Sequence, residues 1–340
     1  MKLVQAAKSN GRTLPVDPAV ATDVLDCLRD HDQFVMCAHE NPDCDVLASG
    51  FALGLALKRM NKRVVYFLDD DVPPNLRFLP ESGLTQRTFE GVGDDAVFIF
   101  FDMSDQKRAG EALAWVPQER IVNIDHHLSN THFGRWNYVR DTEAATGVLV
   151  LHLIAGLKIE VTPDIASCLL SAVLSDTGCF MNSNATPDTM RIGAALVDAG
   201  ADKDRITEQL YQTRPFGGQK LLGLALQTAE LTPDGICYTV VTQKMLEEHG
   251  ATHDDLEDVV GALRAVDKCE VSALFKEAED GNYRVSMRSR GRFNVMNVAK
   301  ALGGGGHFRA AGAPVAGPKE AAVQTALSAI RKEMNVVPGL

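Results

Sequence analysis

The chain has 340 residues, 45% of them hydrophobic, which is enough for a sizeable core and favours two domains over one. Its formal net charge of -11 argues against a general nucleic-acid coat and fits a protein that uses carboxylates as metal ligands. Seven dispersed cysteines without a Cys-x-x-Cys pair favour reduced thiols over a disulfide framework. The sequence contains neither the apolar core of a signal peptide nor a membrane-spanning stretch, so we expect a cytoplasmic protein.

The first half of the chain alternates helical patterns with short apolar runs. Residues 17–31 carry apolar side chains at helical spacing. Four β-rich runs follow, at residues 34–38, 63–68, 96–101 and 120–124. Continuous apolar runs of this kind are typical of a parallel sheet that is buried on both faces. We therefore predict an α/β fold whose N-terminal domain is a parallel sheet with helices on both faces.

Imidazoles and carboxylates follow three of these four runs. They are His39, Asp43 and Asp45 after the first run, Asp102 after the third, and Asp125, His126 and His127 after the fourth. Because right-handed βαβ crossovers place the ends of parallel strands at one edge of a sheet, these side chains are expected to meet there. Two further helical patterns lie near residues 144–156 and 162–175, and the second ends at Asp176.

This set of side chains suits two hard or borderline divalent cations, with shared carboxylates offsetting the repulsion between them. The mixture of nitrogen and oxygen ligands favours manganese over magnesium, and the absence of thiolates disfavours structural zinc. Each residue alone also fits an ordinary role: His39 a strand-end histidine, Asp102 a helix cap, Asp176 a solvated helix end. Because all of these ordinary roles are improbable together, we interpret the set as a metal centre.

The second half of the chain predicts a separate, smaller α/β domain with a mixed sheet. Its strands are expected at residues 236–242, 271–276 and 283–288, and its helices near 253–266, 294–302 and 318–334. The helical pattern of residues 188–215 breaks at a Pro- and Gly-containing segment, where we place the linker. The predicted boundaries are residues 1–187 for the first domain, 188–217 for a helical linker and 218–340 for the second domain.

A basic segment without acidic residues spans residues 282–311. A charge run is usually a solvated face, but Arg288 and Arg290 alternate along a strand and could both face one phosphate. The glycine run 303–306 offers backbone amides to a phosphate and His307 adds a donor, although such a run is also an ordinary turn. We interpret the segment as a substrate-binding surface, with these contacts: Arg288, Arg290, Gly304, Gly305, Gly306 and His307.

The ordered motifs resemble those of the DHH phosphoesterase family. They are His39-x-x-Pro-Asp43-x-Asp45, the lone Asp102, Asp125-His126-His127, and Ser175-Asp176-Thr-Gly178. The segment from Gly303 to His307 resembles the family's C-terminal DHHA1 substrate-binding domain, and the similarity covers nearly the whole chain. The length and two-domain plan resemble the branch of oligoribonucleases that are also phosphatases of 3′-phosphoadenosine 5′-phosphate (PAP).

The resemblance implies two divalent cations, manganese first, with magnesium or cobalt as alternatives. One cation would be bound by His39, Asp43 and Asp102. The second would be bound by Asp45, Asp102, His126 and Asp176, which makes Asp102 the bridging ligand. His127 would contact the scissile phosphate or protonate the leaving oxygen, and Asp125 would orient the histidine pair or complete a coordination sphere.

The activity implied by the resemblance is hydrolysis of short oligoribonucleotides to mononucleotides and of PAP to AMP and phosphate, by a hydroxide that bridges the cations. Linear or cyclic di-adenylate is a further candidate substrate. Because only 6% of the residues are aromatic, we expect the chain to bind a short RNA or nucleotide end and not to track a long single strand. We expect neither a long duplex nor a membrane as partner, and a homodimer is the family expectation. Two alternatives stay open: an inorganic pyrophosphatase or exopolyphosphatase, and a nucleotide-binding sensor without turnover.

Overall fold

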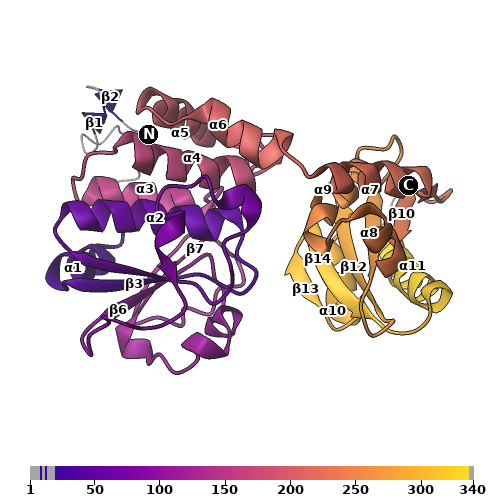
Figure 1. Cartoon of the computed structure of the whole chain (residues 1–340), viewed down its shortest axis with the longest axis horizontal. Helices are drawn as coiled ribbons and strands as arrows, with labels where there is room; N and C mark the ends of the chain where they lie inside the picture. Colours follow the sequence, from indigo (N-terminus) through magenta and orange to yellow (C-terminus); the bar gives the residue numbers. More distant parts are fainter. Residues whose placement is uncertain (1–7, 10–11, 14–19, 337–340) are drawn as a thin grey trace. The chain divides into compact units, whose positions relative to one another are not determined.

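The structure is a computed structural model that describes residues 8–9, 12–13 and 20–336. The chain divides into two compact units between Thr213 and Arg214 (Figure 1). A small antiparallel pair, β1 (Lys8–Ser9) and β2 (Arg12–Thr13), precedes the first unit's main sheet. None of the seven cysteines, which all lie within residues 20–336, forms a disulfide. In this same stretch, no helix combines the length and the apolar character needed to cross a bilayer.

The first unit is built on a six-stranded sheet in the order β5-β4-β3-β6-β7-β8, and every neighbouring pair is parallel. The strands are β3 (Gln33–Cys37), β4 (Arg63–Phe67), β5 (Thr85–Gln86), β6 (Val97–Phe101), β7 (Ile121–Asp125) and β8 (Trp136–Val139). The four predicted strands are confirmed as β3, β4, β6 and β7. The strand order reverses between β3 and β6, which is the position where open α/β sheets bind ligands.

Helices cover one face of this sheet in two layers. The inner layer is α1 (Thr22–Asp30), α2 (Cys44–Arg59) and α3 (Thr146–Gly156), and α4 (Pro163–Asp176) packs on α2 and α3. The predicted beginning of the first helix, residues 17–19, lies outside the described residues. The other face packs against two 3₁₀ turns, η3 (Gln106–Ala109) and η4 (Glu111–Leu113). Gly110, whose φ is +78°, separates these two turns, which keeps them short.

The stretch predicted as a helical linker, residues 188–217, mostly belongs to the first unit. It contains α5 (Pro187–Asp198), α6 (Lys203–Thr207) and the π-helical turn η6 (Glu208–Gln212). Helix α5 packs on α4 and buries Ile192 and Leu196 in the first unit's core, so it is not a free-standing connector. The remaining 3₁₀ turns are η1 (Pro74–Leu76), η2 (Ser82–Leu84), η5 (Gln118–Arg120) and, in the second unit, η7 (His253–Leu256).

The second unit is built on a mixed six-stranded sheet in the order β13-β14-β12-β11-β10-β9. The strands are β9 (Glu230–Leu231), β10 (Ile236–Val241), β11 (Val271–Glu277), β12 (Tyr283–Ser289), β13 (Gly305–His307) and β14 (Ala310–Val315). Only the β10–β11 pair is parallel among the pairs of this sheet that the structure describes, which confirms the predicted mixed sheet.

Helices cover both faces of the second sheet. One face packs on α10 (Val295–Ala301) and α11 (Lys319–Val336), and the other on α7 (Phe216–Gln227), α8 (Gln243–His249) and α9 (Glu257–Arg264). Two separate apolar clusters therefore lie on the two sides of the sheet, which is why this unit has its own core.

Candidate metal centre

The structure brings the predicted metal ligands together at the C-terminal edge of the first sheet. Three groups of side chains have ligand atoms within 4.8 Å of one another: His39, Asp43 and Asp102; Asp45, His126 and Asp176; and Asp102, His126 and His127. The first group has the same residues as one ligand set that the family resemblance implies, and the second contains three of the four residues of the other set, without Asp102. Because β3 and β6 flank the point where the strand order reverses, the cluster lies where this fold class binds ligands.

His39 has the geometry of a metal ligand. It lies just after β3 and only 4% of it is exposed. Its Nδ1–H donates to the carbonyl of Glu40 at 2.9 Å, which leaves Nε2 3.9 Å from Oδ2 of Asp43. No described residue hydrogen-bonds this buried Nε2, an arrangement that is unfavourable unless another group binds there. Burial lowers the pKa of His39, so Nε2 keeps its lone pair near neutral pH.

Asp45 is held by the N-terminus of another helix. It lies in the first turn of α2 and is completely buried. Its Oδ2 accepts from the backbone N–H of Thr146 at 2.7 Å, and its Oδ1 accepts from the backbone N–H of Gly147 at 3.0 Å. Ser49 Oγ donates to the same Oδ1 at 3.0 Å. The start of α3 thus stabilises a buried carboxylate, as helix N-termini do. Asp43, the N-cap of α2, accepts from the N–H of Val46 at 3.1 Å.

Asp102 is central to the cluster and its backbone is strained. It follows β6 directly, and its φ of +55° is in the left-handed region that non-glycine residues avoid. Its Oδ1 accepts from Thr146 Oγ1 at 3.0 Å. The same oxygen lies 3.3 Å from Nε2 of His126 and 3.5 Å from Nδ1 of His127. One carboxylate therefore contacts residues of more than one ligand group, which is the geometry expected of a bridging ligand.

Asp125 lies completely buried at the end of β7 and contacts His127 and Asn130. Its Oδ1 accepts from His127 Nδ1–H at 2.6 Å, and its Oδ2 accepts from Asn130 Nδ2 at 2.5 Å. His126 Nδ1–H donates to the carbonyl of Glu143 at 3.1 Å, so its Nε2 faces the carboxylates. The two histidines are thus fixed in different orientations, one towards the ligand cluster and one against Asp125.

Asp176 completes the cluster from the last turn of α4. Its Oδ2 lies 3.1 Å from Nε2 of His126. The C-terminal end of a helix disfavours a carboxylate, because it carries partial negative charge. Two amide side chains oppose this: Asn182 Nδ2 and Asn184 Nδ2 donate to the Asp176 carbonyl at 3.3 Å and 3.2 Å. Asn184 Nδ2 also donates to the carbonyl of Ala144 at 3.0 Å, which ties the end of α4 to the start of α3.

The crowded carboxylates disturb one another's protonation. Burial, together with the charges of Asp176 and Asp102, raises the pKa of Asp45 well above its usual range. Desolvation and the same two carboxylates raise the pKa of Asp43 to about 7. Because 55% of this side chain is exposed to solvent, we attribute the shift mainly to the like charges of Asp102 and Asp176. Burial also raises the pKa of Asp176. Although burial acts against it, contact with Asp102 and Asp176 raises the pKa of His126 to about 12.

These pKa shifts describe a buried cluster in which carboxylates outnumber the groups that can carry positive charge. Burial works against ionisation of Asp102, but the hydrogen bond and charge of His126 hold the pKa of Asp102 below its ordinary value. Divalent cations would offset the repulsion and give the buried Nε2 of His39 a partner. The donor set of imidazole nitrogens and carboxylate oxygens therefore fits a divalent metal ion, and the cluster could hold one.

Sequence reasoning missed the residues that hold the ligands in place. Thr146 and Gly147 begin helix α3. Their contacts with Asp45 join residues about a hundred positions apart in the sequence, and the contact of Thr146 with Asp102 joins residues 44 positions apart. Gly147 is also required sterically, since a Cβ there would lie 2.5 Å from that of Ala172. Asn130 could have been suggested by its position in the sequence, because it lies only five residues after Asp125. No local signal separates the supporting residues of this kind from ordinary helix and loop residues.

The predicted substrate-binding residues lie in the second unit. Arg288 is on β12 and pairs in register with Ala310 of β14, which in turn pairs with His307 of β13. The backbones of Arg288 and His307 therefore lie in one row across the sheet, while the side chain of His307 is outside the described part of the chain. Strand β12 ends at Ser289, so Arg290 does not share the strand with Arg288 as expected. Arg290 instead donates its N–H to the carbonyl of Glu270 at 2.8 Å.

The glycine run has a structural role that the sequence did not predict. Gly305 and Gly306 are part of strand β13, which pairs with β14. A Cβ at Gly304 would lie 2.1 Å from the carbonyl oxygen of Gly312, and one at Gly306 2.6 Å from that of Ala310. The φ of Gly306 is +137°, which also favours glycine. Close approach of two backbones is thus sufficient reason for these glycines, and their predicted contact with substrate stays a prediction.

Family models and known proteins agree with this architecture. Residues 33–173 match the model of the DHH family, N-terminal domain, and residues 235–335 match that of the DHHA1 domain. The bifunctional oligoribonuclease and PAP phosphatase NrnA of Thermus thermophilus is 35% identical over 303 residues, which cover 88% of this chain and 90% of the relative. The chain belongs to the DHH family. The resemblance inferred from the motifs is confirmed.

Two further known proteins match this chain over most of their length. The bifunctional oligoribonuclease and PAP phosphatase NrnA of Bacillus subtilis is 26% identical over 300 residues, covering 86% of this chain and 93% of the relative. The crystal structure of an exopolyphosphatase-related protein from Bacteroides fragilis matches with a TM-score of 0.86 and 23% identity, covering 94% of this chain and 99% of that chain. The similarity to the B. fragilis structure shows a shared fold.

Proposed function

We infer that this chain is a hydrolase of phosphoester bonds, and we propose that it cleaves short oligoribonucleotides to mononucleotides and PAP to AMP and phosphate. The observation that carries the proposal is the pair of ligand groups, His39–Asp43–Asp102 and Asp45–His126–Asp176, that meet at Asp102. The names of the T. thermophilus and B. subtilis relatives, bifunctional oligoribonuclease and PAP phosphatase, support the substrate class. Linear or cyclic di-adenylate is a further candidate substrate.

The proposed cofactors are two divalent cations, with manganese preferred for its tolerance of imidazole ligands. When bound, the cations polarise the phosphoryl oxygens and lower the pKa of a water, so that hydroxide is available near neutral pH. The residues that would hold them are those of the two groups: His39, Asp43, Asp45, Asp102, His126 and Asp176. Thr146 keeps Asp102 in place and also holds Asp45 through its backbone, so both groups share one support.

His127 is proposed to assist the leaving oxygen. Its Nδ1–H donates to the buried carboxylate of Asp125, so Nε2 is the atom that offers a proton to the substrate. Burial lowers the pKa of His127, but the hydrogen bond to Asp125 and the charge of Asp102 outweigh it and raise the pKa above its ordinary value. The raised pKa favours the imidazolium form of His127, which can act as a general acid. Asn130 and the backbone N–H of His126 fix Asp125 for this role.

The second unit is proposed to bind the part of the substrate beyond the scissile bond. The proposed contacts are Arg288, Arg290, Gly304, Gly305, Gly306 and His307. We expect Arg288→Ala to raise KM for a dinucleotide, with a smaller effect on bis-p-nitrophenyl phosphate, which has no second nucleoside. Arg284→Ala is the matched control, because Arg284 is an exposed arginine on the same face of β12, four residues before Arg288. Equal losses on both substrates would contradict a substrate-binding role for Arg288.

Product analysis tests the proposed function directly. The purified chain in manganese would receive a 5′-phosphorylated dinucleotide, a 20-mer RNA, PAP and pyrophosphate in parallel, with a chelator-treated sample as control. We expect mononucleotides from the dinucleotide, phosphate from PAP, and a nearly intact 20-mer. Phosphate from pyrophosphate alone would instead establish a pyrophosphatase. Calorimetric binding of the dinucleotide without any product would establish a sensor, although a sensor has no chemical need for the complete ligand set. The cytoplasmic location and the homodimer stay predictions.

A further inference from the structure

Arg108 joins two of the loops that carry candidate metal ligands. It lies in the 3₁₀ turn η3, six residues after Asp102. Its backbone carbonyl accepts from the N–H of Glu40, next to His39, at 2.9 Å. Its guanidinium Nη1 donates to the backbone carbonyl of Asp102 at 3.3 Å. The side chain therefore lies at the metal cluster, although no sequence motif pointed to it.

The guanidinium of Arg108 keeps donors available beside the cluster. Arg108 is exposed. Within the part of the chain that the structure describes, its side chain makes one hydrogen bond, from Nη1 to the carbonyl of Asp102. An arginine has five N–H donors, so several remain for another partner. An exposed guanidinium next to a carboxylate cluster is thus placed to meet an anion that arrives from solvent.

We propose that Arg108 is a catalytic residue that binds a non-bridging phosphate oxygen of the substrate at the metal cluster. The proposal rests on the phosphoesterase function proposed above and adds a cation supplied by the first unit itself. Guanidinium groups bind phosphate oxygens through charge-assisted hydrogen bonds, which strengthen as negative charge develops in the transition state. The loss of one such hydrogen bond typically lowers a rate or an affinity about 10- to 100-fold.

The alternative role for Arg108 is structural: its contact with the Asp102 carbonyl could stabilise the left-handed backbone of that residue. The two roles differ in what they do to manganese. A phosphate-binding arginine leaves the affinity for the metal unchanged, whereas a residue that positions Asp102 lowers it. Manganese binding, measured without substrate, therefore separates them.

The experiment compares Arg108→Ala and Arg108→Lys with Lys107→Ala, which removes the same charge from the neighbouring exposed residue of the turn. Each variant is measured for kcat/KM on a 5′-phosphorylated dinucleotide, for the inhibition constant of inorganic phosphate, and for manganese binding by calorimetry. For Arg108→Ala we expect about a 10- to 100-fold loss in kcat/KM and a comparable rise in the inhibition constant. Arg108→Lys should recover part of both, and Lys107→Ala should stay within about twofold of wild type.

Three results would overturn the proposal. If Arg108→Ala has the kcat/KM and the phosphate inhibition constant of the wild type, Arg108 does not bind the substrate. The activity of the wild type would in that case still support the proposed phosphoesterase function. Weakened manganese binding in Arg108→Ala would make it a residue that positions Asp102. Wild-type protein without activity on any phosphate ester would refute the proposed function itself and this proposal with it.

Discussion

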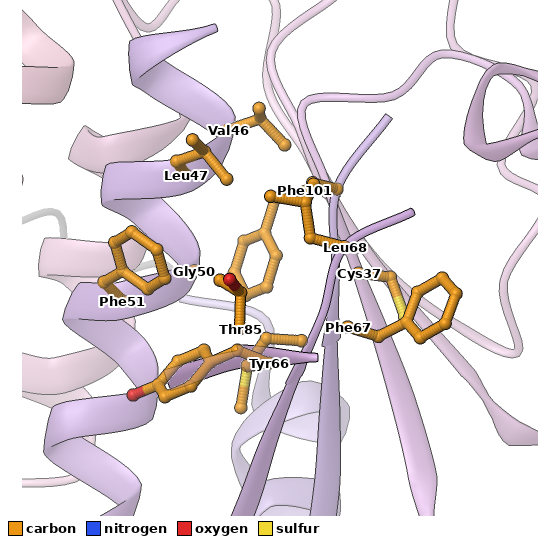
Figure 2. A pocket seen from close by; sticks show the side chains of 12 residues that line it. Cys37, Val46, Leu47, Gly50, Phe51, Tyr66, Phe67, Leu68, Thr85 and Phe101 are labelled. Carbon is orange, nitrogen blue, oxygen red and sulfur yellow. The ribbon is translucent and has the colours of Figure 1, made fainter. Parts of the chain in front are cut away.

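Replacing Gly50 by alanine should stabilise the first unit. Gly50 lies in the interior of α2 and lines a small apolar cavity of about 20 Å³ between this helix and the sheet (Figure 2). A Cβ there would lie 3.6 Å from the ring of Phe101 and 3.8 Å from Cβ of Met36, which are ordinary van der Waals distances. Glycine in a helix interior costs about 1 kcal/mol relative to alanine, and a buried methyl adds up to about 0.8 kcal/mol. We therefore expect a gain of about 1–2 kcal/mol.

Gly54 provides the matched control, one helical turn later on α2. A Cβ at Gly54 would lie 2.3 Å from Oη of Tyr66, which is far too close. Tyr66 is only 4% exposed and packs edge-on against Phe51 with 5.2 Å between ring centroids, so it cannot move without disturbing the core. Overpacking of this kind costs about 1–3 kcal/mol, which cancels or exceeds the gain in helix propensity. Gly54→Ala should therefore lose up to about 2 kcal/mol.

Tryptophan fluorescence makes the assay specific for the first unit, because both tryptophans of the chain, Trp115 and Trp136, lie in it. Thermal and urea unfolding would be followed in a chelator, so that metal binding does not contribute. For a unit of this size, 1 kcal/mol corresponds to about 2–4 °C in Tm, so Gly50→Ala should raise Tm by about 2–8 °C. Destabilisation by Gly50→Ala, or equal stabilisation by Gly54→Ala, would refute the packing argument.

Two further predictions concern the metal centre. In the metal-free protein, the pKa in the folded state is about 7 for Asp43 and about 12 for His126. In the unfolded chain, Asp43 releases its proton above about pH 4 and His126 above about pH 6.5, whereas the folded state keeps both protons to higher pH. The free energy of unfolding should therefore fall as pH rises from about 4 to 8, and the increase in Tm caused by manganese should be larger at pH 8 than at pH 5.5; an increase that shrinks with pH would contradict the cluster's charge balance. Asn184→Ala removes the link between the carbonyls of Asp176 and Ala144 and should weaken manganese binding about tenfold by calorimetry. Asn182→Ala, which removes only a contact to Asp176, should weaken it less, and equal losses would show that the link to α3 is unimportant.

The strands and their ligands were predictable because several levels of the sequence agree. An apolar run such as residues 97–101 is typical of a buried strand, and candidate ligands follow or end this strand and both of its neighbours, β3 and β7. Strand β8 was missed because it has four residues, only one of them buried. Residues such as Thr146 and Asn184 were missed because their partners are set by tertiary packing, which leaves no local pattern.

Glycines were the least predictable residues, because one residue type serves several physical needs. The segment after Arg214 was interpreted as a break, yet α7 begins at Phe216 and contains Gly217 in its first turn. A Cβ at Gly217 would lie 2.2 Å from the carbonyl oxygen of His249, so backbone packing explains this glycine. Gly304 is explained in the same way by its approach to β14. A sequence does not distinguish a glycine that makes room for a ligand from one that makes room for a strand or a helix.

Asp102 is the residue that we propose unites two metal sites in one hydrolytic centre. The most direct test of this bridging role is hydrolysis of a 5′-phosphorylated dinucleotide by Asp102→Ala. Calorimetry would measure manganese binding by the same variant, and tryptophan fluorescence would check that it is folded. We expect the wild type to bind two manganese ions per chain and to turn over. The folded variant should lose turnover, because Asp102 belongs to the first ligand group and its Oδ1 lies 3.3 Å from Nε2 of His126 in the second. Substantial residual activity in a folded Asp102→Ala protein would contradict the two-metal account.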